Sequence, residues 1–290
     1  MKRIAIIQGG AWGDNINSTL MLEPLRSHFG KCQIDVHTST RYGDAFKNNP
    51  LIDNIHLHNA KEKIEAIQLA SRLPDSLSAT NHYDLIIANH PMYRRDLWID
   101  EESERKTPNI INTWINTLRE INVPIGDVRT TLYLTQPEIN AAHHMLAKVH
   151  SGRPKVLMEI SGESGQTFWS PRWTSVVGDY LCQRGFDVLI SNNHLRADIA
   201  ELQTIHPSQV FWVGNLTLRE CAEIFNHCHA FISVSSGLSN TCNTQWCRKD
   251  IQWFEAVSST DCDSYPLRSV GKQFFYEQQP EKFVKLLAKL

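Results

Sequence analysis

The chain has 290 residues, of which 41% are hydrophobic and 21% are charged. This composition is that of a soluble globular protein and excludes a disordered, collagenous or coiled-coil chain. At roughly 100–200 residues per domain, the length predicts two domains. The 29 Lys and Arg residues against 31 Asp and Glu give a net charge of -2. A nucleic-acid binder usually has a basic excess or a basic stripe, and the sequence has neither.

The first residues predict a cytoplasmic protein. The apolar run Ile4–Ile7 is shorter than the about 7–15 residues of a signal-peptide core. No window approaches the roughly 18 apolar residues that cross a bilayer, so we expect no transmembrane segment. The seven cysteines are therefore expected to be reduced. Peripheral contact with the inner face of a membrane is left open.

The first half of the chain predicts strands that alternate with helices. Its expected strands are Arg3–Gln8, Gln33–Ser39, Ile52–His58 and Tyr83–His90, and its expected helices lie near 15–28, 61–72, 107–121 and 136–148. Consecutive apolar residues, as in Leu85–Ala88, are typical of parallel strands that helices cover on both faces. The polar segment 93–106 is expected to be a loop.

The second half repeats this alternation after a polar stretch with Gly and Pro, His150–Pro154, where we place the linker. Its expected strands are Lys155–Ser161, Asp187–Asn193, Val210–Gly214, Ala230–Ser236 and Ile251–Val257, and its expected helices lie near 171–184, 197–204, 217–227, 238–246 and 280–290. We therefore expect an α/β protein of two Rossmann-like domains, 1–150 and 151–290, whose parallel sheets face a central cleft. Whether helix 280–290 packs back on the first domain is left open.

A glycine-rich turn follows the first strand. It contains Gly9, Gly10 and Gly13 and ends in Asp14, where a helix is expected to start. Glycines let the backbone approach a ligand closely, and the turn lacks the G-x-G-x-x-G pattern of dinucleotide sites. Asp14 has two interpretations that the spacing alone leaves open. It is either a general base or a cap of the following helix.

A second turn, rich in hydroxyl groups, follows the strand that ends near Ser236. It contains Ser235, Ser236, Gly237 and Asn240. Hydroxyl and backbone N–H groups at the start of a helix suit a diphosphate. The alternative is a helix cap in a turn of small residues.

Metal binding is not predicted. The residues Cys221, Cys228, Cys242, Cys247 and Cys262 lie close in sequence, beside His227 and His229, but contain no C-x-x-C pair and fit no common zinc module. Cys221 and Cys228 are spaced for core packing on one helix. The pair His143-His144 is expected on a solvated or interdomain helix face.

Taken in order, these motifs resemble those of glycosyltransferase family 9, the bacterial lipopolysaccharide heptosyltransferases, along most of the chain. The matching pieces are Gly13-Asp14 with Leu20 and Leu25-Arg26, Phe46–Asp53, Tyr83–Ile86, Trp169–Trp173 with Arg184-Gly185, Gly214–Leu218 with Ala222 and Phe225, and Ser235–Asn240. The resemblance implies the GT-B fold. It also implies an inverting transfer of a sugar, heptose or another, from a nucleotide-diphosphate sugar to a hydroxyl group, with no metal and no further cofactor.

The resemblance also implies roles for individual residues. Asp14 would be the general base. The donor would be bound by Ser161, Gly162, Glu163, Leu216, Ser235, Ser236, Gly237 and Asn240. The family's cation before the Trp-Pro pair is absent, because Thr167 and Phe168 stand there. Arg172, which lies nearby, is either its substitute or a surface residue of the helix. The family's Asp and His in the last motif are Ser235 and Asn240 here.

These departures leave two other functions open. One is a degenerate homologue that binds a nucleotide sugar without transferring it. The other is a different two-Rossmann enzyme, such as a nucleotide-sugar epimerase. For a transferase, the acceptor stays open among glycans, lipid-linked sugars, proteins and modified nucleic acid.

Overall fold

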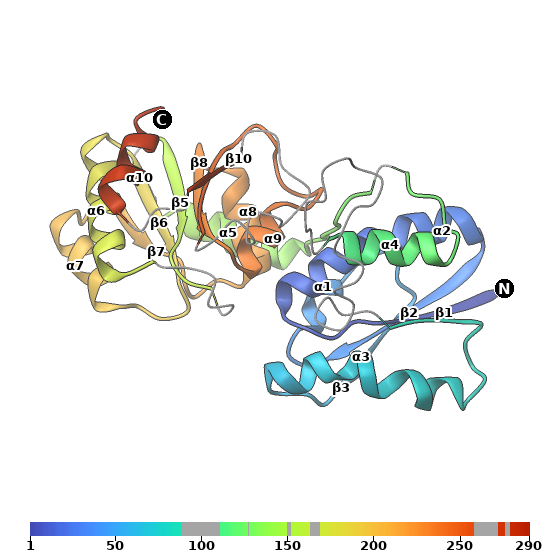
Figure 1. Cartoon of the computed structure of the whole chain (residues 1–290). Coiled ribbons are helices and arrows are strands. Elements are labelled where there is room, and N and C mark those ends of the chain that lie inside the picture. The colour runs from blue at the N-terminus through green and yellow to red at the C-terminus, as the bar shows by residue number, and fades with distance from the viewer. Residues whose placement is uncertain (89–110, 127, 150–151, 163–168, 258–271, 276–278) are drawn as a thin grey trace. The chain divides into compact units, whose positions relative to one another are not determined.

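The structure is a computed structural model that describes residues 1–88, 111–126, 128–149, 152–162, 169–257, 272–275 and 279–290. The described residues form two compact units, the first ending at Tyr133 and the second beginning at Leu134. Each unit contains one parallel sheet with helices around it (Figure 1). The expected α/β class with two parallel sheets is confirmed.

The first unit has a four-stranded sheet in the order β3-β2-β1-β4. Its elements are β1 (Lys2–Ile7), α1 (Trp12–Ser18), the 3-10 helix η1 (Thr19–Met21), α2 (Leu22–Phe29), β2 (Cys32–Ser39), the 3-10 helix η2 (Gly43–Phe46), β3 (Asn54–His58), α3 (Lys63–Ser78), β4 (Leu85–Ala88) and α4 (Asn112–Glu120). Residues Ile4–Ile7 are all buried. This follows from the position of β1 between β2 and β4, with α3 on one face of the sheet and the other helices on the opposite face (Figure 1).

Where one helix was expected over 15–28, the chain forms α1, η1 and α2 in succession. The physical reason is Pro24, which has no N–H to donate to the carbonyl four residues earlier. Since α2 begins at Leu22, Pro24 falls in its first turn, where an N–H would lack an intrahelical partner in any case. The predicted loop 93–106 and the predicted strand end at His90 lie outside the described residues.

The second unit has a six-stranded parallel sheet in the order β10-β9-β8-β5-β6-β7. Its elements are α5 (Gln136–Leu146), β5 (Lys155–Glu159), α6 (Pro171–Gln183), β6 (Asp187–Ser191), α7 (Ala197–Ile205), β7 (Val210–Trp212), α8 (Leu218–Asn226), β8 (Ala230–Val234), α9 (Gly237–Cys242), β9 (Gln252–Ala256), β10 (Lys272–Phe275) and α10 (Pro280–Leu287). The five predicted strands are present, and β10 is an addition to them.

At the two ends of the second unit, one helix differs from the sequence expectation and the other answers a question that the sequence left open. Helix α5, expected to close the first domain, belongs to the second unit, where it packs on α8. Helix α10 packs on α6, and its side chains Phe283 and Leu287 are buried in the core of the second unit with Trp169 and Trp173. The boundary between the units therefore falls ahead of α5, well before the linker expected near residue 150.

Candidate functional site

Each sheet has a switch point, where the order of strands reverses direction. In the first unit β2 and β3 extend to one side of β1 and β4 lies on the other side. In the second unit β6 and β7 extend to one side of β5, and β8 lies on the other side. Open parallel sheets bind ligands outside the carboxyl ends of the strands at such points. We call these the first switch point (β1 and β4) and the second switch point (β5 and β8).

The predicted glycine-rich turn lies at the first switch point, directly after β1. A Cβ on Gly9 would lie 2.6 Å from the carbonyl oxygen of Ala66 on α3, so only glycine fits at this close approach. Gly10 has a φ of 105°, which favours glycine. The turn is held by Gln8, whose side-chain amide donates to the carbonyl of Gly9 at 2.5 Å.

Asp14 lies in the first turn of α1, and its side chain is half-buried. Its Oδ2 accepts a hydrogen bond from the backbone N–H of Ala11 at 2.9 Å. Asp14 therefore does cap α1, as one of its two interpretations predicts. The same contact fixes the orientation of the carboxylate at the carboxyl end of β1, which is compatible with the role of general base.

The second switch point brings together two of the predicted donor-binding segments. A Cβ on Gly162 would lie 2.7 Å from the carbonyl oxygen of Ser235, so the chain after β5 passes directly against the chain after β8. Ser161 donates its hydroxyl hydrogen to Oδ1 of Asn192, which follows β6, at 2.5 Å. Three neighbouring strands thus contribute to one loop cluster. Glu163 lies outside the described residues.

Ser236 holds the turn before α9. Its Oγ accepts from the N–H of Ser239 at 3.1 Å, and its hydroxyl donates to the buried carboxylate of Glu159, the last residue of β5. The amide of Asn240 donates to the carbonyl of Ser236 at 2.7 Å. The hydrogen bonds of these side chains fix the conformation of the turn. Glu159 was not singled out from the sequence, although a charged residue at the end of an apolar strand was a visible signal.

The remaining predicted donor residues lie on other parts of the second unit. Leu216 is half-buried in the loop between β7 and α8. Arg172 lies at the start of α6, and its guanidinium forms an ion pair of 2.5 Å with Glu281 on α10. Both side chains of this pair are largely exposed. Arg172 is therefore already engaged by a carboxylate.

The cysteines that the structure describes are free and buried (Cys32, Cys182, Cys221, Cys228, Cys242 and Cys247). Burial raises the pKa of Cys182, Cys221 and Cys228 to about 12, which keeps these thiols protonated and makes them poor metal ligands. The expectation of core packing for Cys221 and Cys228 is confirmed. Cys262 lies outside the described residues.

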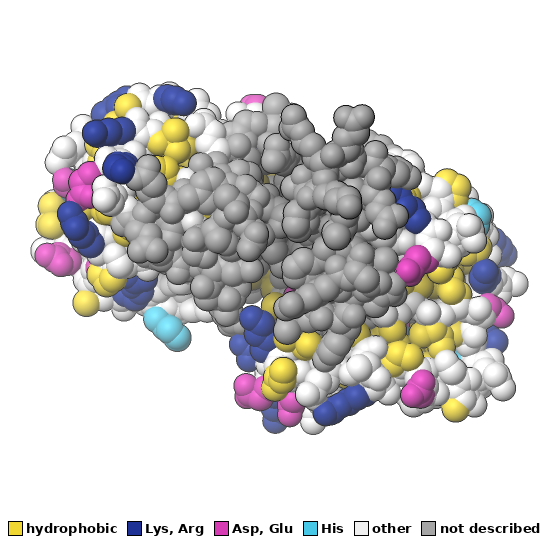
Figure 2. All heavy atoms as spheres, in the orientation of Figure 1, with side chains coloured by type: hydrophobic (Ala, Val, Ile, Leu, Met, Phe, Trp, Pro, Cys, Tyr) yellow, Lys and Arg dark blue, Asp and Glu magenta, His cyan; other side chains and the backbone are white. Residues whose placement is uncertain are grey.

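The surface carries charges of both signs. On the face drawn in Figure 2, the described basic and acidic side chains are interspersed on both units, in keeping with the net charge of -2. None of the helices in the described part of the chain has the length and apolar character needed to span a bilayer.

Comparisons with known proteins support the fold. Neither a protein-family model nor a curated protein sequence matches the chain. Among solved structures, a glycosyl transferase of family 9 from Veillonella parvula is similar over 100% of this chain and 90% of its own, with a TM-score of 0.71 and 16% identity. The ADP-heptose lps heptosyltransferase II of E. coli is similar over 100% and 98%, with a TM-score of 0.68 and 15% identity.

A different class of protein shares the architecture less closely. The structure of a putative UDP-N-acetylglucosamine 2-epimerase from Listeria monocytogenes is similar over 100% of this chain and 88% of its own. The TM-score is 0.55 and the sequence identity is 7%. The chain thus has the two-unit fold of glycosyltransferase family 9, and the resemblance seen in its motifs is confirmed at the level of the fold.

Proposed function

We propose that this protein is an inverting, metal-independent glycosyltransferase. It transfers a sugar from a nucleotide-diphosphate sugar to an acceptor hydroxyl group in the cytoplasm. The observation that carries the proposal is the placement of two chemically different turns at the two switch points. Asp14 follows β1 in the first unit, and the loops of Gly162 and Ser235 touch after β5 and β8 in the second.

The second switch point is the proposed site of the donor. Backbone N–H groups of turns at the carboxyl ends of parallel strands are good ligands for a diphosphate. Ser236 and Asn240 fix the shape of the turn before the donor arrives. Such preorganised dipoles stabilise a leaving diphosphate without reorganisation. Leu216 flanks the nucleoside in this proposal, and Arg172 is its remaining candidate cation.

Asp14 is the proposed general base. Its carboxylate accepts the proton of the acceptor hydroxyl as the hydroxyl oxygen forms a bond to the anomeric carbon. The bond between that carbon and the diphosphate oxygen breaks, and its electron pair leaves on the diphosphate. Because attack and departure occur on opposite faces of the sugar, the anomeric configuration inverts. General-base catalysis of this kind contributes typically 10²–10⁴-fold in rate.

A thermal-unfolding screen with ADP-, GDP-, UDP- and CDP-sugars, and NAD as the control, tests donor binding. A ligand that binds the folded chain raises the melting temperature by mass action, and we expect one of the four nucleotides to do so. The matching sugar should then release its nucleoside diphosphate when truncated lipopolysaccharide cores, oligosaccharides or proteins are added. No melting shift with any nucleotide sugar would overturn the proposal, and a shift without transfer would favour the degenerate homologue.

A nucleotide-sugar epimerase is the second candidate, favoured by the similarity of the Listeria monocytogenes structure to the whole chain. An epimerase would convert its nucleotide sugar with no acceptor present, and its product would keep the sugar. Chromatography of each nucleotide sugar after incubation with the protein alone separates the two candidates.

A further inference from the structure

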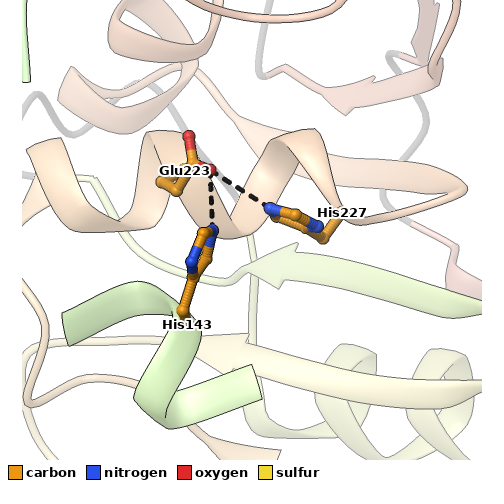
Figure 3. A group of neighbouring side chains, drawn as sticks. All are labelled: His143, Glu223 and His227. Atoms are coloured by element: carbon orange, nitrogen blue, oxygen red, sulfur yellow. Dashed lines mark hydrogen bonds and ion pairs between the residues drawn. The ribbon is translucent and has the colours of Figure 1, made fainter. Parts of the chain in front are cut away.

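Two histidines and one glutamate converge on the surface of the second unit, outside the residues proposed for sugar transfer. His143 comes from α5, and Glu223 and His227 come from α8 (Figure 3). Nε2 of His143 lies 3.2 Å from Oε1 of Glu223, and Nε2 of His227 lies 3.1 Å from the same oxygen. One ligand atom from each of the three residues lies within 4.8 Å of the other two.

Local structure explains why these side chains meet. Glu223 and His227 are four residues apart on α8 and therefore share one face of that helix. Both helices begin with a capping box, Thr135 with Glu138 and Thr217 with Glu220. A buried ion pair then aligns them, because Nε of Arg219 on α8 lies 2.6 Å from Oε1 of Glu138 on α5.

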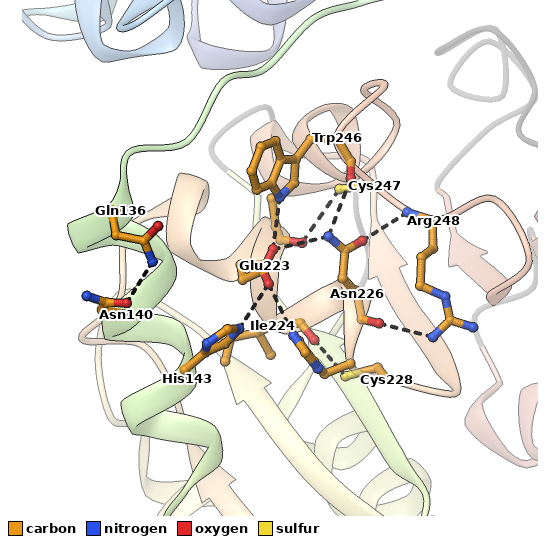
Figure 4. A network of polar contacts seen from close by, with 12 residues as sticks. Gln136, Asn140, His143, Glu223, Ile224, Asn226, Cys228, Trp246, Cys247 and Arg248 are labelled. Atoms are coloured by element: carbon orange, nitrogen blue, oxygen red, sulfur yellow. Dashed lines mark hydrogen bonds and ion pairs between the residues drawn. The ribbon is translucent and has the colours of Figure 1, made fainter.

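Glu223 is oriented by groups that leave one of its oxygens to the histidines. The residue as a whole is buried, with 8% exposure, and its Oε2 accepts from Nε1 of Trp246 at 2.9 Å and from the amide of Asn226 at 3.2 Å. Arg248 in turn holds Asn226 through two hydrogen bonds (Figure 4). Outer contacts of this kind orient metal ligands and are part of how metal sites are built.

The charge and exposure of the three groups also suit an ion. Burial raises the pKa of Glu223, but hydrogen bonds from Trp246, His227, Asn226 and His143 outweigh it and lower the pKa below its usual value. The carboxylate is therefore ionised at neutral pH. The side chains of His143 and His227 are 50% and 44% exposed, which leaves a path from solvent to their ring nitrogens.

We propose that His143, Glu223 and His227 bind a divalent transition-metal ion, with Zn²⁺ as the first choice. Two imidazoles and one carboxylate are a ligand set that zinc sites use, with water in the fourth position. Bonds of about 2.0–2.1 Å in a tetrahedral site place ligand atoms roughly 3.3 Å apart, and two of the three separations here are 3.1 and 3.2 Å. The ion would take the place of the two N–H hydrogens that now point at Oε1.

The proposal does not depend on the sugar-transfer function. It adds an ion that cross-links α5 to α8 at a solvent-facing site. It also differs from a cysteine site, because none of the cysteines that the structure describes belongs to the cluster.

Calorimetric titration of the chelator-treated full chain with Zn²⁺ tests the proposal. We expect one site that is lost in His143→Gln and in His227→Gln. His144→Gln is the matched control, since His144 is the exposed neighbour on the same helix, and it should bind as the wild type does. Trp246→Phe keeps all three ligands and removes an outer contact, so its affinity should fall about 10–100-fold.

Two further readouts keep the result interpretable. The unfolding temperature of His143→Gln in chelator should equal that of the wild type in chelator, which separates lost binding from lost folding. With Co²⁺ in place of Zn²⁺, the wild type should show a visible absorption spectrum without a thiolate charge-transfer band. The proposal is overturned if the wild type binds no Zn²⁺, if His143→Gln binds as His144→Gln does, or if the Co²⁺ spectrum shows thiolate ligation.

Discussion

The two switch points share a topology and differ in chemistry. At the first, the chain leaves β1 through a glycine-rich turn in which Gly9 packs against α3, and Asp14 follows with its carboxylate held by Ala11. At the second, the loops after β5 and β8 are in contact through Gly162 and Ser235 and are lined with small hydroxyl residues. The half-buried carboxylate of Asp14 can accept a proton, whereas the carboxylate at the second switch point, that of Glu159, is buried and already accepts from the hydroxyl of Ser236. In the proposed function, this difference corresponds to proton transfer in the first unit and donor binding in the second.

The largest effect is expected from Asp14→Asn. The amide can still be held near Ala11 but accepts no proton, so kcat for transfer should fall by about 10²–10⁴-fold. The melting shift caused by the donor should stay as it is, since donor binding belongs to the other unit. Asp75→Asn is the control, because Asp75 is exposed on α3. Unchanged turnover in Asp14→Asn would remove this residue from the mechanism.

Gly162→Ala should weaken donor binding at the second switch point, which Asp14→Asn should leave unchanged. The added Cβ lies 2.7 Å from the carbonyl oxygen of Ser235, so the two loops must separate. Losing one hydrogen bond to a charged phosphate costs about 1.5–3 kcal/mol, so we expect the donor affinity measured by calorimetry to fall roughly 10–100-fold. Gly126→Ala adds a Cβ with no atom within 4 Å and should bind the donor normally. Equal donor affinities in Gly162→Ala and Gly126→Ala would show that the contact between Gly162 and Ser235 does not matter for donor binding.

The two units should also respond differently to acid. Burial, with smaller contributions from His56 and His58, lowers the pKa of His37 from 6.5 to about 4. The unfolded chain therefore binds this proton first as the pH falls, and the stability of the first unit decreases from about pH 6.5 downward. At about 1.4 kcal/mol per pH unit, the loss between pH 7.5 and 5 is about 2 kcal/mol.

The ion pair between Glu138 and Arg219 in the second unit is preserved between pH 7.5 and 5. Burial raises the pKa of Glu138, but Arg219 and Thr135 lower it further, from 4.5 to about 2, so its contribution is present above pH 4.5 and is lost only below that value. Hydrogen exchange at pH 7.5 and 5 should show β1 and β2 losing protection before β5 and β6. Equal losses, or an unchanged pH dependence in His37→Gln, would contradict this assignment.

The smallest effect on stability is expected from Arg172→Gln. The pair with Glu281 is exposed on both sides, and exposed ion pairs contribute about 0–1 kcal/mol. The free energy of unfolding should therefore change by less than about 1 kcal/mol in urea titrations. If donor affinity falls in this variant while Glu281→Gln keeps it, Arg172 binds the phosphates in place of the family's missing cation.

Much of the fold could be predicted because an apolar run such as Ile4–Ile7 indicates a strand that helices cover on both faces of the sheet. The grouping of α5 could not. It depends on Glu138 and Arg219, which are 81 residues apart, and no local pattern encodes that contact. The four-residue strand β10 was missed because so short a segment has little periodicity.

The candidate site shows the same division. Turn composition located Gly9–Asp14 and Ser235–Gly237, because glycines and hydroxyl residues at strand ends have local causes. The histidine–glutamate cluster needed the structure, since His143 lies 80 residues from Glu223. A partial signal was present, namely a glutamate and a histidine at i and i+4 on one helix, but two ligands on one helix do not by themselves predict a metal site.

The separation of roles between the two units is tested most directly by titrating the wild type, Asp14→Asn and Gly162→Ala with ADP, GDP, UDP and CDP in a calorimeter. The account predicts that one nucleotide binds the wild type and Asp14→Asn with equal affinity and binds Gly162→Ala about 10–100-fold more weakly. Loss of binding in Asp14→Asn with normal binding in Gly162→Ala would contradict it.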